Sequence, residues 1–327
     1  MTSVLALLED PPRLVDPATP VLRADDLGVA RGESVFETLR LAGGRPAFLD
    51  LHLARLARSA ERVGIALPQG WERLALVAAT AYGDADGMLR LTCSKGPAGG
   101  VPVGFALASP IAAETVRGRE HGVTAVTLSL GVPADLRASA PWLLGGVKST
   151  SYAVNMASLR AAEERGAQDA IWVSLDGQVL EAPTSTVAWV TDGALVTPPA
   201  EEIGTLPGTT AAVALELAEV PVEVRRGTVE ELHAASEVLL LSSVRGVAPV
   251  VRLDGRDLPV GPVTAALRAA FERAVREVDV VVDGSGLRIE PVASEHLVDR
   301  EGVLVVPASG ASIDDETVRS LRDADQR

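Results

Sequence analysis

The chain has 327 residues and a formal net charge of −14, and 47% of its residues are hydrophobic. The hydrophobic content excludes a disordered protein, and the length allows two domains with a sizeable core. The negative charge disfavours nucleic acid and anionic membranes as partners, but it is compatible with a local basic pocket for a small anion.

Cysteine and histidine are scarce, which limits the kinds of site that the chain can contain. Cys93 is the single cysteine, and the four histidines form no HExxH pair. The sequence therefore predicts neither an intrachain disulfide framework nor a metal site. Residues 1–16 lack the basic start of a signal peptide, and no apolar stretch is long enough for a membrane helix. We expect a soluble cytoplasmic protein.

The first third of the chain has the pattern of an α+β unit. Residues 34–50 form two strand-like runs around a Gly-Gly turn, which predicts a hairpin. Residues 49–65 show apolar positions at helical spacing, and residues 71–87 predict a second helix. Two further strand-like runs follow, at 88–96 and 103–109. We place a smaller N-terminal domain at residues 1–115.

A larger unit follows, in which strands and helices are interspersed. Its predicted strands are 122–130, 169–175, 187–192, 194–199, 236–243 and 248–255. Its predicted helices are 152–167, 209–220, 228–235 and 261–278. These elements define a domain at residues 116–277, and the two units together predict an α+β or α/β fold.

From residue 278 the chain changes in character. Strand-like runs at 278–291 and 302–310 precede a polar end at 313–327. We interpret residues 278–327 as a C-terminal extension of unknown role.

Lys148 is the first candidate for chemistry. It lies in GGVKSTSYAVN, a run of small and hydroxyl-bearing residues just before a predicted helix. A lysine is ordinarily a solvated surface residue, but a buried lysine can lose its proton and become a nucleophile. A Schiff base with an aldehyde cofactor is the obvious use of such an amine. Glu181, which precedes APTST, is either a turn carboxylate or the partner of a protonated ring nitrogen.

A second group of residues indicates an anion site. Gly208, Thr209 and Thr210 open a predicted helix, where backbone N–H groups bind anions, although threonine is also a common N-cap. Ser243 ends a predicted strand and carries a further hydroxyl. Arg55 is either a solvated helix arginine or a guanidinium for the same anion.

Six segments occur in an order that is typical of one enzyme family. They are GESVFETLR, HLARLARSA, VKSTSYAVNMASLRAAEERGAQDAIWV, GQVLEAPTSTVAWV, TLPGTTAAVALELA and LLLSSVRGVAPVVRLDG. Together they resemble the fold type IV family of pyridoxal 5′-phosphate (PLP) enzymes, also called class IV aminotransferases, from about residue 20 to 276. The resemblance implies a two-domain fold similar to that of D-amino acid aminotransferase, and PLP as the cofactor.

The resemblance also implies roles for individual residues. Lys148 would form the Schiff base with PLP and act as the catalytic residue, and Glu181 would face the pyridine nitrogen. Leu206 would lie under the ring. The phosphate would be bound by Arg55, Gly208, Thr209, Thr210 and Ser243. A homodimer is expected, because sites in this family lie near a subunit interface.

The family contains enzymes with different reactions, and the sequence favours a lyase. Lyase members convert 4-amino-4-deoxychorismate into 4-aminobenzoate and pyruvate, a step toward folate. Transaminase members act on D-amino acids or branched-chain L-amino acids. The segment LSSVRGVAPVVRLDG is more similar to the lyases. A class IV aminotransferase is the alternative, and a non-catalytic PLP-binding homologue is a minor one.

The residue that binds the substrate carboxylate is less clearly marked. The segment PAGGVPVGFA, which follows RLTCSKG, lacks the Arg and His that D-amino acid transaminases carry at the corresponding place, and it also lacks the Arg that lyases often carry nearby. Arg90 is the leading candidate, against the alternative of an edge-strand arginine. Arg137 is a weaker one, because the pattern there favours a solvated loop arginine. Thr38 and Tyr152 are further candidates for the substrate site, with strand packing favoured for Thr38.

Overall fold

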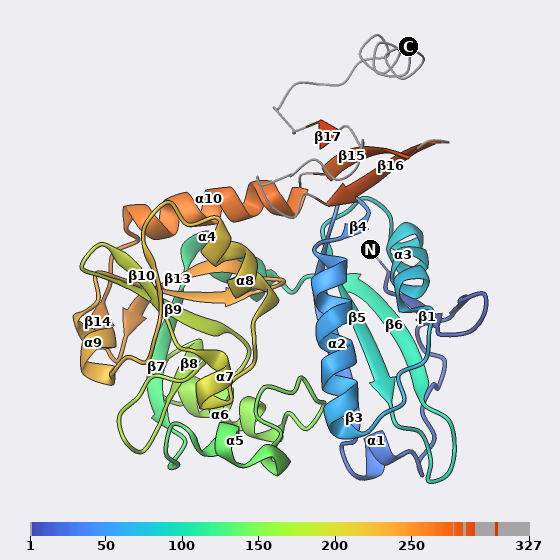
Figure 1. The fold of residues 1–327 in the computed structure, drawn as a ribbon, viewed down its shortest axis with the longest axis horizontal. Coiled ribbons are helices and arrows are strands. Elements are labelled where there is room, and N and C mark those ends of the chain that lie inside the picture. Colours follow the sequence, from blue (N-terminus) through green and yellow to red (C-terminus); the bar gives the residue numbers. More distant parts are fainter. Residues whose placement is uncertain (1, 277, 284–285, 292–304, 307–327) are drawn as a thin grey trace. The chain divides into compact units, whose positions relative to one another are not determined.

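The computed structural model describes residues 2–276, 278–283, 286–291 and 305–306. The chain divides into two compact units, residues 1–276 and residues 277–327. The first unit contains two β-sheets with helices packed against them (Figure 1). Among the residues described, no helix has the length and apolar character needed to span a membrane.

The first sheet has six antiparallel strands in the order β2-β1-β6-β5-β3-β4. Its strands are β1 (Val4–Leu7), β2 (Arg13–Val15), β3 (Ser34–Ala42), β4 (Arg45–Pro46), β5 (Gly87–Ser94) and β6 (Val103–Pro110). The helices in this part are α1 (Leu27–Ala30), α2 (Leu49–Val63) and α3 (Trp71–Tyr82). Gly43 and Gly44 join β3 to β4 with φ angles of 55° and 75°. Glycine adopts these angles without steric cost, and the predicted hairpin is confirmed.

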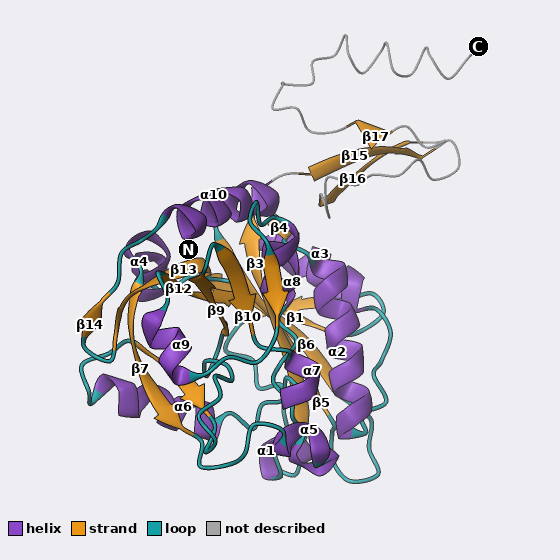
Figure 2. Cartoon of the chain, turned by 60° about the vertical axis from the view of Figure 1, so that its left-hand side comes forward, coloured by secondary structure: helices purple, strands orange, loops and turns teal. Residues whose placement is uncertain are grey.

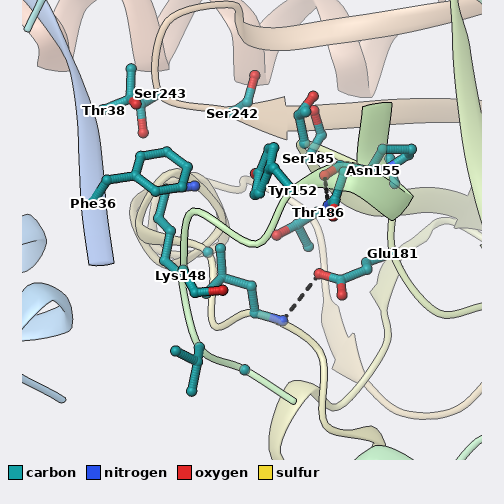
Figure 3. Close-up of a pocket in the computed structure, with 18 of the residues that line it drawn as sticks. Phe36, Thr38, Lys148, Tyr152, Asn155, Glu181, Ser185, Thr186, Ser242 and Ser243 are labelled. Carbon is teal, nitrogen blue, oxygen red and sulfur yellow. Dashed lines mark hydrogen bonds between the residues drawn. The ribbon is translucent and has the colours of Figure 1, made fainter. Parts of the chain in front are cut away.

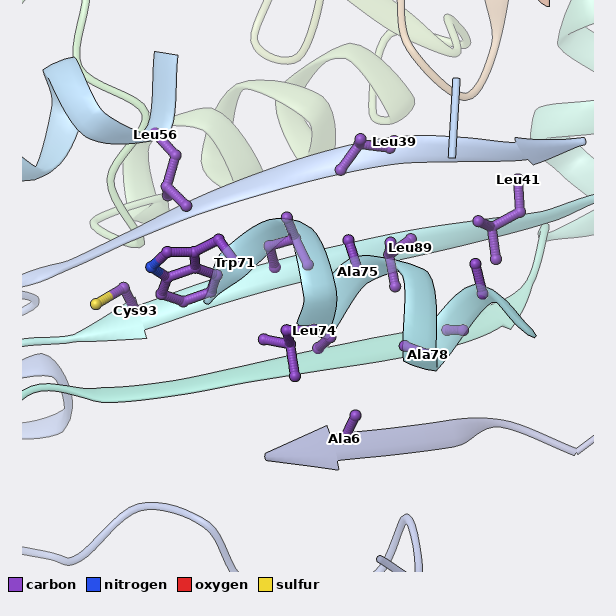
Figure 4. Close-up of a cluster of buried hydrophobic side chains, with 14 of the residues drawn as sticks. Ala6, Leu39, Leu41, Leu56, Trp71, Leu74, Ala75, Ala78, Leu89 and Cys93 are labelled. Carbon is purple, nitrogen blue, oxygen red and sulfur yellow. The ribbon is translucent and has the colours of Figure 1, made fainter. Parts of the chain in front are cut away.

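Helices α2 and α3 build the core of this first sheet (Figure 4). Helix α2 packs on β3, and α3 packs on β1 and β6. The side chains of Leu39, Leu56, Leu74 and Leu89 are fully buried there. Each contributes about 1.5–3 kcal/mol relative to an exposed position. This packing holds β3 and α2 rigidly, and both carry residues of the site.

The second sheet has eight strands and is mixed. Its order is β11-β10-β9-β12-β13-β7-β8, and β14 pairs with β13. The β10–β11, β13–β7 and β7–β8 pairs are parallel and the others are antiparallel. The strands are β7 (Val123–Ser129), β8 (Asp169–Val173), β9 (Thr186–Thr191), β10 (Ala194–Thr197), β11 (Val222–Val224), β12 (Glu237–Ser242), β13 (Gly246–Leu253) and β14 (Arg256–Asp257).

Helices of this half cover the second sheet (Figure 2). They are α4 (Ala113–His121), α5 (Leu136–Ser139), the 3₁₀ turn η1 (Pro141–Leu143), α6 (Ala153–Glu163), α7 (Ala200–Ile203), α8 (Thr209–Glu216), α9 (Val229–Ala234) and α10 (Pro262–Arg276). One apolar cluster joins β9, β10 and β12 to α8 and α10. Phe48, just before α2, belongs to the same cluster, and its ring centre lies 5.8 Å from that of Phe271. The contact anchors the start of α2 on the second half.

The second unit contains a small antiparallel sheet in the order β16-β15-β17. Its strands are β15 (Val278–Asp283), β16 (Gly286–Pro291) and β17 (Val305–Val306). The strand prediction at 278–291 is confirmed, and within 302–310 the described strand is β17. The predicted polar end at 313–327 lies outside the described residues. The domain limits at residues 115 and 277 stay predictions. The limit at 115 lies between the last strand of the first sheet, which ends at residue 110, and the first strand of the second sheet, which begins at residue 123.

Candidate active site

Every residue predicted for the site lines one cavity of about 580 Å³. Its walls come from β3, α2 and β5, from the loop before α6, from residues 181–186, from the start of α8 and from the turn after β12 (Figure 3). The predicted residues on these walls are Thr38, Arg55, Arg90, Lys148, Tyr152, Glu181, Leu206, Gly208, Thr209, Thr210 and Ser243. The fold therefore brings widely separated motifs into one place, while their individual roles stay predictions.

Lys148 lies in a loop whose backbone is bonded to the first sheet and to α2. Its carbonyl accepts the Phe36 N–H at 3.0 Å, and its N–H donates to the Ser59 hydroxyl at 3.2 Å. The Thr150 N–H donates to the Ser34 carbonyl at 2.9 Å. These bonds fix the origin of the Lys148 side chain, which extends beside the Phe36 ring in the cavity (Figure 3).

The surroundings of the Lys148 amine favour its neutral form. Burial, followed by the positive charge of Arg55, lowers the pKa of Lys148 from 10.5 to about 8. Its Nζ lies 4.6 Å from the centre of the Phe36 ring and 6.0 Å from that of Tyr152. An amine with this pKa is partly unprotonated near neutral pH, which a nucleophile or a general base requires.

Glu181 presents a carboxylate that is fixed at both oxygens. Its Oε1 accepts a hydrogen bond from Arg137 Nη1 at 2.8 Å, and its Oε2 accepts the Leu206 N–H at 3.0 Å. Its backbone carbonyl accepts the Trp172 N–H at 2.7 Å, which ties it to β8. Arg137 is thus an ion-pair partner of Glu181, and the prediction of a solvated loop arginine was wrong. The pair depends on a tertiary contact that the loop sequence alone does not reveal.

The start of α8 and the turn after β12 together form a cradle of hydrogen-bonding groups, which could hold an anion. Gly208 is the N-cap of α8, and Thr209 and Thr210 stand in its first turn, where backbone N–H groups lack helical partners. Thr210 Oγ1 lies 3.4 Å from Ser243 Oγ. A Cβ added at Gly208 would lie 2.3 Å from Thr186 Oγ1. A side chain at this position would therefore displace the Thr186 hydroxyl.

Arg55 reaches the cavity from α2 with part of its guanidinium already bound. Its Nε and Nη2 donate to the two carboxylate oxygens of Glu37 at 2.8 and 2.7 Å. Its Nη1 donates to the Pro207 carbonyl at 2.9 Å. Each terminal nitrogen carries two hydrogens, so one N–H on each is left for an anion.

Glu37 and His52 are buried site residues that sequence reasoning missed. His52 Nδ1 lies 2.7 Å from Glu37 Oε2. Burial opposes the charge on Glu37, but hydrogen bonds from Arg55 and His52 lower its pKa to about 2. Burial also lowers the pKa of His52, against the opposing influence of Glu37. Glu37 lies in the motif GESVFETLR and His52 lies in HLARLARSA. His52 and Arg55 are three residues apart and so share one face of the helix, and this spacing was a signal that could have revealed His52.

Arg90 extends from β5 over the Phe36 ring. Its Cζ lies 3.8 Å from the ring centre, and Thr38 is opposite Arg90 in the β3–β5 register. Within the part of the chain described, no carboxylate pairs with this guanidinium. The Tyr152 ring meets Phe36 edge-on at 5.3 Å, and burial raises the pKa of its hydroxyl, which keeps its proton. A free guanidinium near the Lys148 amine suits a carboxylate ligand.

A family model confirms what these motifs indicate. Residues 34–253 match the model for amino-transferase class IV. The chain belongs to this family. The predicted fold type IV architecture and the prediction of a PLP-dependent enzyme are confirmed.

Several proteins of known description are similar to this class IV aminotransferase. A Mycobacterium tuberculosis protein named as a bifunctional aminodeoxychorismate lyase / D-amino acid transaminase is 39% identical over 278 residues, which cover 80% of this chain and 96% of the relative. A hypothetical aminotransferase from the same species, in a PLP-bound form, has a TM-score of 0.79 and 39% identity over 83% of this chain and 98% of that one. A 4-amino-4-deoxychorismate lyase from Pseudomonas aeruginosa has a TM-score of 0.66 and 29% identity over 77% of this chain and 94% of that one.

The cavity of this class IV aminotransferase fits PLP. The phosphate needs hydrogen-bond donors such as the backbone N–H groups at the start of α8. The aldehyde needs an amine such as that of Lys148, and the ring nitrogen needs a carboxylate such as the fixed one of Glu181. In the described residues no cluster of His, Cys, Asp or Glu is arranged to hold a metal ion.

Proposed function

We propose that this enzyme is a 4-amino-4-deoxychorismate lyase that forms 4-aminobenzoate and pyruvate, a step toward folate. The observation that carries the proposal is a cavity shared by the Lys148 amine, the fixed Glu181 carboxylate and an Arg90 guanidinium with no carboxylate partner among the described residues. Such a site suits a substrate with both an amine and a carboxylate. The segment LSSVRGVAPVVRLDG and the bifunctional mycobacterial relative support the lyase reaction.

Residues from both sheets would hold the cofactor. When bound, PLP supplies an aldehyde carbon for an amine and a ring that accepts electrons from the substrate. In the proposal Lys148 binds the aldehyde carbon and Glu181 keeps the ring nitrogen charged. Leu206 supports the ring. Arg55, the start of α8 and Ser243 bind the phosphate, and fixing the phosphate fixes the reacting atoms relative to Lys148.

Lys148 moves the protons in this proposal. In the lyase reaction a proton leaves the amine-bearing carbon of the substrate, the enolpyruvyl group departs as pyruvate, and an aromatic ring remains. The pKa of Lys148, about 8, lies close to working pH, so the amine can both take a proton and return it. Its backbone bonds to Phe36 and Ser59 fix the point from which its side chain extends into the cavity.

Arg90 would hold the substrate carboxylate. Its guanidinium is charged at all working pH values, and the Phe36 ring supports it from one side. Thr38, opposite Arg90 on β3, and the protonated hydroxyl of Tyr152 would supply further hydrogen bonds to the substrate. These contacts orient the amine-bearing carbon toward Lys148.

Product release without an acceptor tests the lyase reaction. Purified enzyme given 4-amino-4-deoxychorismate should release 4-aminobenzoate with no keto acid present, and Lys148→Ala should release none. If release needs a keto acid, or if only D-alanine or L-leucine reacts, the lyase proposal is wrong. The chain has only two lysines, Lys95 and Lys148. Borohydride reduction and peptide mapping therefore identify the lysine that carries PLP.

Transamination of D-amino acids is the second candidate. The double name of the mycobacterial relative favours it, whereas the absence of Arg and His from PAGGVPVGFA argues for another way of binding the carboxylate. Transfer of an amino group from D-alanine to 2-oxoglutarate measures it directly. Failure of every amine donor would instead indicate a non-catalytic homologue.

We further propose a cytoplasmic homodimer whose subunits meet beside the cavity. Trp142, Leu143 and Val154 are 79%, 46% and 60% exposed, and the last two line the cavity. Large apolar side chains exposed together are typical of a surface that a partner covers. Sedimentation as a monomer at micromolar concentration would contradict the dimer.

A further inference from the structure

His52 is a buried imidazole that the proposed reaction does not use. It lies on α2 and is 1% exposed. Its Nδ1 is 2.7 Å from Glu37 Oε2, and its Nε2 is 3.3 Å from both Thr209 Oγ1 and Ser243 Oγ. Thr209 and Ser243 line the cavity and His52 does not. The imidazole can therefore influence an anion in the cradle through these hydroxyls.

Glu37 fixes the tautomer of His52. The pKa of Glu37 is about 2, so its carboxylate is ionised and only accepts hydrogen bonds. The imidazole hydrogen must then be on Nδ1. In the neutral ring Nε2 is an acceptor, and it takes the hydrogen of the Thr209 or the Ser243 hydroxyl. That hydroxyl turns its hydrogen away from the cavity.

A phosphate in the cradle needs the same hydrogens. The oxygens of a phosphate dianion only accept, and each hydroxyl has a single hydrogen to give. Thr209 or Ser243 therefore cannot donate to His52 and to the phosphate together. If Nε2 carries its own proton, it donates to the hydroxyl oxygen, and the hydroxyl donates to the phosphate. A proton on Nε2 therefore lets each group in the series, from the imidazole to the hydroxyl to the phosphate, donate its hydrogen toward the phosphate.

The charges around the cradle point to the same protonation. The titratable groups that act on His52 are Glu37 from β3, Arg55 from α2 and Lys148 from the loop before α6. Glu37 already neutralises Arg55 through two hydrogen bonds. The hydroxyls that face His52 from α8 and from the turn after β12 are neutral. A phosphate monoester brings about two negative charges, and the start of α8 offsets them only in part.

We propose that phosphate binding in this cradle places a proton from solvent on His52 Nε2, so that His52 becomes a second positive charge behind the hydroxyls of Thr209 and Ser243. His52 is then a positioning residue that acts on the phosphate through these hydroxyls. Before binding, burial lowers the pKa of His52 against the influence of Glu37, and the ring is neutral near pH 8. The inference rests on the proposed placement of the cofactor phosphate.

Proton uptake on ligand binding tests the proposal. Pyridoxine 5′-phosphate is the probe, because it lacks the aldehyde and does not react with Lys148. Calorimetry of the full chain without PLP, in two phosphate-free buffers of different ionisation enthalpy, counts the protons taken up. At about pH 8 we expect uptake of about one proton, with binding about tenfold weaker for each pH unit that is added. Pyridoxine, which has no phosphate, should cause no uptake.

Two variants separate His52 from the other histidines. His52→Gln keeps a hydrogen-bonding side chain that cannot be charged, so the uptake should fall by about one proton and the tenfold loss of binding per pH unit should disappear. His233→Gln is the matched control, because His233 Nε2 lies 2.8 Å from Asp254 Oδ2 but its side chain is 43% exposed and outside the cavity. It should keep the uptake. The same uptake in wild type and His52→Gln would overturn the proposal.

Nitrogen NMR of the PLP-loaded enzyme gives a result that does not depend on the folding of a His52 variant. The chain has four histidines, so the His52 signals are assigned by replacing His121, His233 and His296 in turn. We expect both ring nitrogens of His52 to be protonated with PLP bound and only Nδ1 without it. Phosphorus NMR should show a dianion. A neutral His52 ring or a phosphate monoanion in the loaded enzyme would refute the proposal.

The outcomes distinguish this proposal from the placement of the phosphate. If pyridoxine 5′-phosphate binds no more tightly than pyridoxine, the placement of the phosphate is wrong, and the role of His52 fails with it. If binding depends on the phosphate but no proton is taken up, only the role of His52 is wrong.

Discussion

Replacing Lys148 by methionine should stabilise the PLP-free protein while it abolishes the reaction. Folding lowers the pKa of Lys148 from 10.5 to about 8, a difference of about 2.5 (10.5 − 8). At about 1.36 kcal/mol for each unit, the charged amine costs folding about 3 kcal/mol at neutral pH. Because the residue is only half-buried, solvent reduces this cost to about 1–3 kcal/mol. Methionine keeps the unbranched shape and removes the charge.

The dependence on pH has a defined sign. Between about pH 8 and 10.5 the unfolded chain holds a proton on Lys148 that the folded protein has lost, so the free energy of unfolding rises with pH there. The gain in the free energy of unfolding of Lys148→Met over the wild type should be fully present below pH 8. It should shrink as pH rises and vanish above 10.5.

Urea unfolding of the PLP-free proteins at about pH 7 and about pH 9.5 measures both effects. Lys95→Met is the matched control, because Lys95 is the only other lysine and pairs with Glu33. We expect no gain in stability from it. A Lys148→Met protein that is less stable than the wild type, or a gain that is equal at the two pH values, would refute the idea that burial disfavours the charged amine.

Three further substitutions test other parts of the site and the fold. Arg90→Ala should raise the KM for the carboxylate substrate by about 10- to 100-fold, and an equal loss with amines that lack a carboxylate would contradict its role. Gly208→Ala brings a Cβ to 2.3 Å from Thr186 Oγ1, so the Kd for PLP in equilibrium dialysis should rise at least about tenfold; an unchanged Kd would exclude a phosphate at α8. Arg40→Met removes a 1% exposed guanidinium that donates to Glu272 at 2.7 and 2.9 Å. Breaking a fully buried ion pair costs more, but Glu272 is partly solvated, so we expect the free energy of unfolding in urea to fall by about 2 kcal/mol. An unchanged free energy of unfolding would mean that water solvates Glu272 as well as Arg40 does.

The principal site residues could be predicted because each lies within a continuous motif. Lys148 precedes a helix, Glu181 precedes a strand and Thr210 opens a helix, so the sequence around each residue indicates its local position. The resemblance of these ordered motifs to fold type IV enzymes predicted that they share a site, and the structure places all of these residues on the walls of one cavity.

The partners of these residues could not be predicted in the same way. Arg137 pairs with Glu181 across 44 positions, and the loop around Arg137 shows no pattern that reveals the contact. Glu37 has no exposed surface although it is ionised. Charged side chains are ordinarily expected at the surface, and only the nearby Arg55 and His52 make the buried carboxylate favourable. Such networks depend on distances between elements, which a linear pattern does not contain.

Short elements of the fold also escaped prediction. The four residues of β1 (Val4–Leu7) show only an apolar run, and β1 is a strand because β6 and β2 pair with its two edges. Helix α4 (Ala113–His121) is polar and has one buried residue, Gly118. Periodicity needs a longer amphipathic window than either element offers.

The backbone bonds of Lys148 have a mechanical consequence. They tie the lysine to β3 and α2, whereas Glu181, Leu206 and Ser243 are carried by the second sheet and its connections. Any ligand that engages both sets is a cross-link between the two sheets. Its binding then stabilises the folded state of residues 2–276, by an amount that grows with the logarithm of its concentration relative to its Kd. A cofactor held by both sets of residues would stabilise the fold as well as take part in the reaction.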